Sequence, residues 1–229
     1  MKWDRPPGRD DEFKRQQVQL LGELKWRQEY ECEFLSSDAL LIDSRKLLTM
    51  RHSEPIKEYR DFKFWAPIYP ENAYIVTVDP ATGSGSDYSV IDVYHFPTLE
   101  QVAQLRTNDL PSPQLYSRLK WVLKGLENKM CDVYFTIENN GVGEGLIALY
   151  EADEHPPMDA VFVGDETKRP GMSTIGRTKL RSCVMYKELI ESDRVIIHSA
   201  QTLLELKTYV RKGGSYQAQV GATDDCVVS

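Results

Sequence analysis

The sequence lacks the features that direct a chain into a membrane or out of the cell. No apolar run approaches the roughly 18 residues that a membrane-spanning helix needs, and residues 1–4 do not begin a signal peptide. The four cysteines lie far apart and form no C-x-x-C pair, which argues against a zinc site or a disulfide framework. We therefore expect a cytosolic protein, with no membrane partner, whose cysteines are buried thiols.

The sequence also lacks a G-x-x-x-x-G-K-[ST] loop for nucleotide phosphates. The nearest approximation, Gly171 to Thr178, has Arg177 in place of the lysine. The strand predicted before it ends at Val163, too early for a strand-loop-helix unit. The four histidines show no H-E-x-x-H or similar ligand spacing. These absences argue against a nucleotide site at this loop and against a histidine-bound metal.

The composition is typical of a globular protein of one or two domains. Of the 229 residues, 41% are hydrophobic and 28% are charged, and the formal net charge is -7. This average disfavours nucleic-acid binding, but the acidic excess lies in residues 72–165, which carry 5 basic and 14 acidic side chains. Residues 166–187 carry six basic side chains and one acid. Such a segment is either a solvated helix face or a surface that binds phosphates.

Strand and helix patterns alternate after residue 70. Short apolar runs predict strands, and apolar residues at helical spacing predict helices between them. The expected strands are residues 73–78, 88–94, 101–105, 133–137, 160–163 and 195–197. The expected helices are residues 112–126, 141–150, 174–191 and 203–209, followed by a hairpin at Gly213-Gly214 and a last helix capped by Thr223. Three antiparallel strands before the first crossover helix predict an α/β fold with a ribonuclease H-like mixed sheet, antiparallel strands first and parallel strands after, with helices on both faces.

Acidic residues follow two of the buried strands and precede the last helix. Asp79 and Glu138 each come after about five apolar strand residues, so we expect their carboxylates to share one edge of the sheet. Bringing them together costs several kcal/mol unless a cation or hydrogen-bond donors compensate. Asp224 and Asp225 add negative charge, which favours divalent cations with oxygen ligands. Taken singly, each acid also has a purely structural interpretation. Asp79 could form a turn, Glu138 could lie in a solvated loop, and Asp224 could cap a helix.

Three short stretches carry these acids in a distinctive order. They are Val78-Asp79-Pro80-Ala81 through Gly85-Ser86-Asp87-Tyr88-Ser89, Phe135-Thr136-Ile137-Glu138-Asn139 and Gly221-Ala222-Thr223-Asp224-Asp225. In order and spacing they resemble the nuclease domain of the large terminase subunits of tailed bacteriophages. Residues 26–34 resemble the segment that follows the packaging ATPase domain in such proteins. The resemblance covers nearly the whole chain.

The resemblance implies a metal-dependent endonuclease that cleaves double-stranded viral DNA concatemers during genome packaging. It makes Asp79, Glu138 and Asp225 the catalytic, metal-binding acids of a site for two Mg²⁺ or Mn²⁺ ions. Asp224 is the alternative to Asp225, and Asp87 is a further candidate ligand. We expect basic side chains, most of them in residues 166–187, to contact DNA phosphates. The residues predicted for that contact are Lys168, Arg169, Arg177, Lys179, Arg181, Arg211 and Lys212.

The resemblance also implies how the chain is organised and where it acts. We expect residues 1–70, which include a first helix from Asp10 to Leu24 and a proline-containing connector at 51–72, to follow an ATPase domain absent from this sequence. Residues 71–229 would form the nuclease domain. The chain stops within the predicted last helix, so we expect an excised domain. Its partners in the full-length protein would be the ATPase domain, the portal and the small terminase subunit, in the host cytoplasm.

Two other interpretations remain open at the level of sequence. A sugar-kinase or actin-like ATPase shares the strand order and would place phosphate at the Asp79 to Ser86 loop, but only about one domain of chain follows residue 70. Alternatively, the chain is a docking or DNA-contact module of the packaging motor that retains the fold without a working metal centre.

Overall fold

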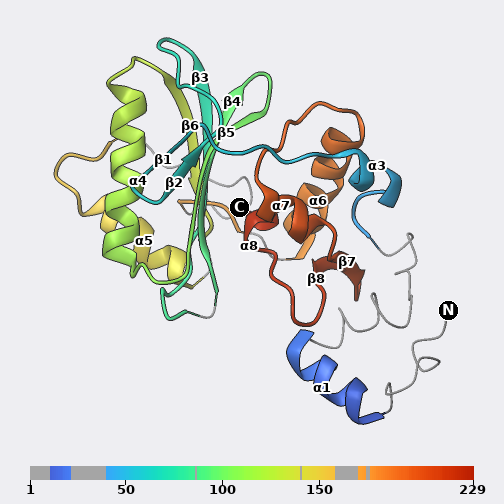
Figure 1. Ribbon diagram of the computed structural model, residues 1–229. Helices are drawn as coiled ribbons and strands as arrows, with labels where there is room; N and C mark the ends of the chain where they lie inside the picture. The colour runs from blue at the N-terminus through green and yellow to red at the C-terminus, as the bar shows by residue number, and fades with distance from the viewer. Residues whose placement is uncertain (1–10, 22–39, 86, 140, 158–169, 174–175) are drawn as a thin grey trace.

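The computed structural model describes residues 11–21, 40–85, 87–139, 141–157, 170–173 and 176–229. A central sheet separates two groups of helices, with α4 and α5 on one face and α6, α7 and α8 on the other (Figure 1). This arrangement confirms the predicted α/β fold with helices on both faces. The expected strand at 160–163 and the first two residues of the helix expected at 174–191 lie outside the described residues.

The sheet has six strands in the order β1-β2-β5-β4-β3-β6. Their bounds are β1 Lys57–Tyr59, β2 Phe62–Phe64, β3 Ala73–Asp79, β4 Ser89–Phe96, β5 Glu100–Thr107 and β6 Asp132–Ile137. All neighbouring pairs are antiparallel except β3 with β6, which run parallel in a register that pairs Val78 with Ile137. Because parallel strands end at the same edge, the residues that terminate β3 and β6 are brought side by side.

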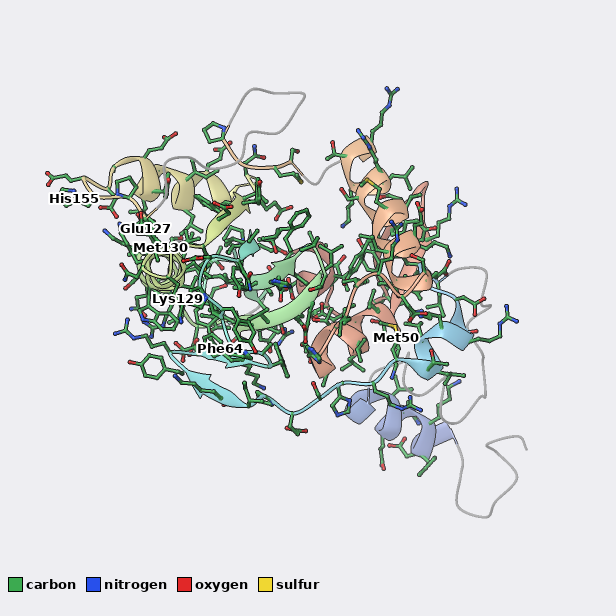
Figure 2. All side chains as sticks on the ribbon, turned by 90° about the horizontal axis from the view of Figure 1, so that it is seen from above. Met50, Phe64, Glu127, Lys129, Met130 and His155 are labelled. Atoms are coloured by element: carbon green, nitrogen blue, oxygen red, sulfur yellow. The ribbon has the colours of Figure 1, made fainter. Side chains whose placement is uncertain are left out.

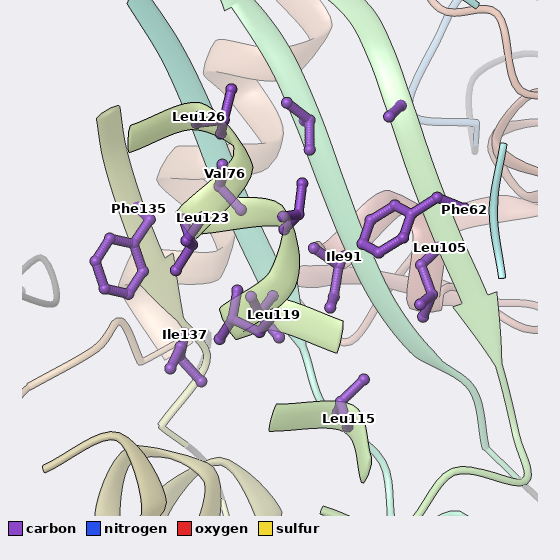
Figure 3. Close-up of a cluster of buried hydrophobic side chains, with 14 of the residues drawn as sticks. Phe62, Val76, Ile91, Leu105, Leu115, Leu119, Leu123, Leu126, Phe135 and Ile137 are labelled. Atoms are coloured by element: carbon purple, nitrogen blue, oxygen red, sulfur yellow. The ribbon is translucent and has the colours of Figure 1, made fainter. Parts of the chain in front are cut away.

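The main core lies between the sheet and helices α4 (Ser112–Glu127) and α5 (Val142–Glu151). Strand β3 alternates in burial, so that Tyr74, Val76 and Val78 face this core while Asp79 points to the other face. Helix α4 begins with a proline in its first turn and buries one apolar stripe against the strands (Figure 3). The stripe consists of Leu115, Leu119, Val122, Leu123 and Leu126. Each such leucine contributes about 1.5–3 kcal/mol through burial, which makes β3 and β6 a rigid support for their terminal residues.

A second, smaller core lies on the opposite face of the sheet. Its elements are α3 Ser44–Thr49, α6 Gly176–Glu191, α7 Ala200–Leu206, the hairpin strands β7 Tyr209–Lys212 and β8 Ser215–Ala218, and α8 Asp225–Val228; α1 spans Asp11–Leu21. Buried Leu41, Ile190, Leu206 and Tyr209 hold this layer together. Seen from above, Met50 lies beside this layer, whereas Glu127 and Met130 lie at the end of α4 across the sheet (Figure 2). Short α8 also packs against β3 and β4.

Several local expectations need correction. Residues 51–72 were expected to form a connector, but β1 and β2 extend the sheet there. The segment expected as a strand at 195–197 forms only an isolated parallel bridge between Glu100 and Ile196. The cap residue of α8 is Asp224 rather than Thr223, because the Thr223 hydroxyl donates to Glu205 instead, at 2.8 Å. The division at residue 70 stays a prediction.

The cysteines among the described residues differ in burial. Cys183 and Cys226 are buried free thiols, as expected, but Cys131 is only half-buried, and Cys32 lies outside the described ranges. Among the described residues, no helix has both the length and the apolar character required to cross a bilayer.

Candidate active site

Asp79 and Glu138 meet at the carboxyl ends of β3 and β6. The Glu138 backbone N–H donates to the Val78 carbonyl at 2.8 Å, which continues the parallel ladder one residue beyond the strand. The two carboxyl groups hydrogen-bond to each other. Burial, this hydrogen bond and repulsion from Glu138 together raise the pKa of Asp79 to about 9. At neutral pH the pair therefore holds a proton unless a cation replaces it.

Asp225 approaches the same edge from the first turn of α8. Its Oδ2 atom is buried and has no hydrogen-bond partner among the described residues. Burial first, and then repulsion from Glu205, raise the pKa of Asp225 to about 6, while Arg106 acts in the opposite direction. A buried carboxylate oxygen without a donor is costly, and a bound cation would relieve that cost.

Asp224 differs from its neighbour in its surroundings. Its Oδ2 atom accepts a hydrogen bond from the Ala218 backbone N–H at 3.2 Å and lies 3.7 Å from Lys179 Nζ. The protein therefore already compensates the Asp224 charge, whereas it leaves one Asp225 oxygen without a donor. This difference cannot be read from two adjacent aspartates in a sequence.

Electrostatic repulsion connects the five predicted acids in a chain of neighbours. Asp79 is repelled by Glu138, Asp225 and Asp224, and Asp225 is repelled in turn by Asp224 and by exposed Asp87. Within the described ranges, however, no group of three or more His, Cys, Asp or Glu side chains is arranged closely enough to hold a metal ion. The structure thus gathers the charge without forming a complete coordination shell.

Two glycines shape the backbone around Glu138. A Cβ atom on Gly143 would lie 1.6 Å from the Glu138 carbonyl oxygen, so only glycine lets α5 start this close to β6. Gly171 has φ +85°, and a Cβ there would lie 2.4 Å from the Ile137 carbonyl oxygen. Next to it, Met172 forms a parallel bridge with Glu138. The glycine that resembles part of a phosphate loop therefore serves backbone packing beside a site acid.

The predicted DNA-binding residues occupy different environments. Arg177 and Arg181 are exposed on α6, and Arg211 and Lys212 are exposed at the tip of the β7–β8 hairpin. Lys179 instead lies partly buried beside Asp224, with its side chain 25% exposed. Its ammonium group therefore already has an acidic partner, and its predicted contact with DNA stays a prediction. Lys168 and Arg169 lie outside the described residues.

A cavity of about 390 Å³ adjoins the acids on the α8 side of the sheet. Its walls are mostly apolar and include Phe96, Tyr134 and Val228, with Glu138 at its border. The hydroxyl oxygens of Thr77 and Thr136, which also line it, are buried without hydrogen-bond partners in the described part of the chain. Apart from Glu138, the described residues of these walls offer no charged side chain to a cation, so the cavity touches the acids only at Glu138.

The fold and the gathered acids define a class: an RNase H-like domain with carboxylates at the ends of two parallel strands and at the start of a later helix. Residues 76–229 match the family described as the terminase RNaseH-like domain, and the chain belongs to that family.

Solved structures of phage terminases have the same fold. The large terminase nuclease of thermophilic phage G20c with bound magnesium aligns with a TM-score of 0.64 at 17% identity, covering 83% of this chain and 94% of that chain. The cobalt-bound structure of the same nuclease aligns with a TM-score of 0.61 at 18% identity, covering 83% of this chain and 94% of that chain. The large terminase nuclease domain of Thermus phage P74-26 aligns with a TM-score of 0.58 at 19% identity, covering 80% of this chain and 89% of that chain. At these identities the likeness establishes the fold.

Proposed function

We propose that the chain is the nuclease domain of a phage large terminase subunit and acts as a metal-dependent endonuclease on double-stranded DNA. The observation that carries this proposal is the approach of Asp79, Glu138 and Asp225 to one sheet edge, where the Asp79 pKa is raised and an Asp225 oxygen is buried without a donor, so that a bound cation would stabilise the acids. The metal-bound terminase nucleases of phage G20c support it. In the packaging motor, the DNA would be concatemeric viral DNA.

The donor set suits hard divalent cations. Asp79, Glu138 and Asp225 offer only carboxylate oxygens, which fit Mg²⁺ or Mn²⁺ better than softer ions. Among the two adjacent aspartates, Asp225 is the better ligand because its free oxygen has no competing donor. A pair of such ions would supply an activated water and stabilise the leaving 3′ oxygen of a phosphodiester.

The contribution of the chain's own residues follows from their charges. The raised pKa of Asp79 keeps that carboxyl protonated at neutral pH, so binding a cation there should release the proton, and ion affinity should increase with pH. Because the acids do not form a closed shell on their own, we expect ion binding to draw their side chains together. No serine or cysteine nucleophile is needed in this chemistry.

The DNA would lie across the basic surface next to the acids. Arg177 and Arg181 on α6 and Arg211 and Lys212 on the hairpin are exposed and can reach phosphates. Residues 1–70 would link this domain to an ATPase domain, and the portal and small terminase subunit would be further partners in the host cytoplasm. These parts of the proposal rest on family membership.

Plasmid cleavage tests the proposal. Supercoiled plasmid incubated with the chain and Mn²⁺ should be nicked and linearised, and a chelator should stop the reaction. Asp79→Asn should abolish cutting, whereas Asp132→Asn, an exposed acid at the opposite end of β6, should leave it unchanged. Full cutting by the Asp79 variant would remove this residue from the mechanism.

One observation favours a second candidate, the non-catalytic docking module. The described residues contain no ready-made metal cluster. If the chain binds DNA but neither binds Mn²⁺ nor cuts, that candidate replaces the nuclease. Stabilisation by a nucleotide would instead support an actin-like ATPase fragment.

A further inference from the structure

A buried charged pair lies behind the acids, on the side of α7. Glu205 of α7 has a side chain only 2% exposed, and Arg106 of β5 has one 18% exposed. The two approach to 3.5 Å between Arg106 Nη2 and Glu205 Oε1. They are 99 residues apart in the chain, and neither stands in a motif that the sequence reveals.

Glu205 fixes the amino end of α8. Its Oε2 atom accepts a hydrogen bond of 2.7 Å from the backbone N–H of Cys226, the residue after Asp225. Its Oε1 atom accepts a hydrogen bond of 2.8 Å from the Thr223 hydroxyl, just before Asp224. Both contacts are to residues that flank the acidic pair, so the Glu205 carboxylate holds the short segment that aims Asp225 at the sheet edge.

Arg106 connects the turn before α8 to the loop that carries Asp87. Its guanidinium carbon lies 3.2 Å from the ring centroid of Tyr88, the residue after Asp87. Its Nη2 atom also donates to the Thr223 hydroxyl at 3.4 Å. Arg106 Nε is buried and has no hydrogen-bond partner within the described ranges. One cation thus contacts the loop after β3, helix α7 and the turn before α8.

We propose that Arg106 and Glu205 are positioning residues, which hold the start of α8 and the Asp87–Tyr88 loop so that Asp225 meets Asp79 and Glu138 in a geometry that binds metal. This inference rests on the proposed nuclease function. Neither residue is a ligand or touches the reacting atoms. Their effect passes through the backbone of residues 223–226 and through the Tyr88 ring.

Apolar replacement of the Arg106–Glu205 pair distinguishes a positioning role from a role in stability alone. Replacing a buried ion pair by apolar side chains of similar volume is often neutral or stabilising, because the desolvation cost of both charges disappears. If the pair served only stability, apolar replacements would therefore be tolerated without loss of function. If the pair positions α8, apolar replacements would preserve the fold but leave Asp225 less firmly positioned. Mutating a residue that orients a metal ligand typically lowers metal affinity about 10- to 100-fold.

Single substitution of Glu205 gives a sharper version of the test. The Glu205 carboxylate accepts hydrogen bonds from four donors: Arg106 Nη2, the Gln201 amide nitrogen, the Thr223 hydroxyl and the Cys226 N–H. Glu205→Gln must turn an NH₂ group towards at least one of them, so it breaks part of the network at almost constant volume.

The experiment compares four proteins by Mn²⁺ titration calorimetry, by nicking of supercoiled plasmid at saturating Mn²⁺, and by urea unfolding in chelator. They are the wild-type chain, Glu205→Gln, the double variant Arg106→Met/Glu205→Met, and the control Asp153→Asn. The control carboxylate forms an ion pair with Lys120 of α4, which is more exposed than the Arg106–Glu205 pair and lies on the opposite face of the sheet from α8. Each variant's unfolding midpoint shows whether the fold persists.

We expect the double variant to remain folded, with a lower midpoint because the Cys226 N–H and the Thr223 hydroxyl lose their acceptor, and to bind Mn²⁺ about 10-fold more weakly or worse. Glu205→Gln should weaken binding in the same direction. Asp153→Asn should change the midpoint without changing Mn²⁺ affinity. If the wild type binds and cuts but Glu205→Gln matches it in Mn²⁺ affinity, the positioning role is overturned and the nuclease proposal stands. If the wild-type chain itself neither binds Mn²⁺ nor cuts, the proposed function is overturned and the positioning role falls with it.

Discussion

Replacing Asp79 by asparagine should stabilise the metal-free protein while removing its response to metal. The pKa of Asp79 is about 9 in the folded chain against a usual value of 3.8, mainly because of burial and then the contact with Glu138. Between these pH values the folded protein holds a proton that the unfolded chain has released. Its stability therefore falls as pH rises through this window, by about 1.4 kcal/mol per unit.

From pH 4 to pH 7 this slope corresponds to about 4 kcal/mol at most. Asp79 is half-buried, and solvent screening reduces the effect, so we expect about 2 kcal/mol. Asp79→Asn carries no titrating group at this position and relieves the repulsion on Glu138. Urea unfolding in chelator at pH 5, 7 and 8.5 measures the difference, with Asp132→Asn as the matched control. A variant that is less stable than the wild type at pH 8.5, or that keeps the wild-type pH slope, would refute this reasoning.

Two further changes probe the surroundings of the acids. Gly143→Ala should destabilise the fold by about 3 kcal/mol or more in urea unfolding, because its Cβ would overlap the Glu138 carbonyl oxygen; an unchanged midpoint would contradict the packing described. Arg177→Ala with Arg181→Ala should weaken DNA binding and reduce the slope of log affinity against log salt by about 2, measured by fluorescence anisotropy; an unchanged slope would make these arginines ordinary surface residues.

The sequence predicted the parts of the site that depend on local pattern. Val76 and Val78 before Asp79, and Phe135 and Ile137 before Glu138, mark strands that can only be buried. Three antiparallel strands followed by a crossover helix predict that β6 returns beside β3 and parallel to it, which brings the ends of the two strands together. The family resemblance then proposed Asp225, with Asp224 as the alternative, as the third acid, and this assignment stays a prediction.

What the sequence could not predict depends on contacts between distant segments. Strands β1 and β2 have three residues each, and the residues of β1 are exposed. Their identity as strands comes from pairing, of β2 with β5 and of β1 with β2, rather than from their own composition. The choice between Asp224 and Asp225 depends on which oxygen meets the Ala218 N–H. Arg106 and Glu205 carry no local signal because their importance arises only when β5, α7 and α8 pack together.

Anomalous diffraction from crystals of the chain soaked in Mn²⁺ tests the central claim most directly. The account predicts anomalous peaks within about 2.0–2.3 Å of carboxylate oxygens of Asp79, Glu138 and Asp225, with the Asp225 Oδ2 atom among the ligands. Peaks that appear only elsewhere, or a crystal in which these three carboxylates bind no ion at saturating Mn²⁺, would contradict it.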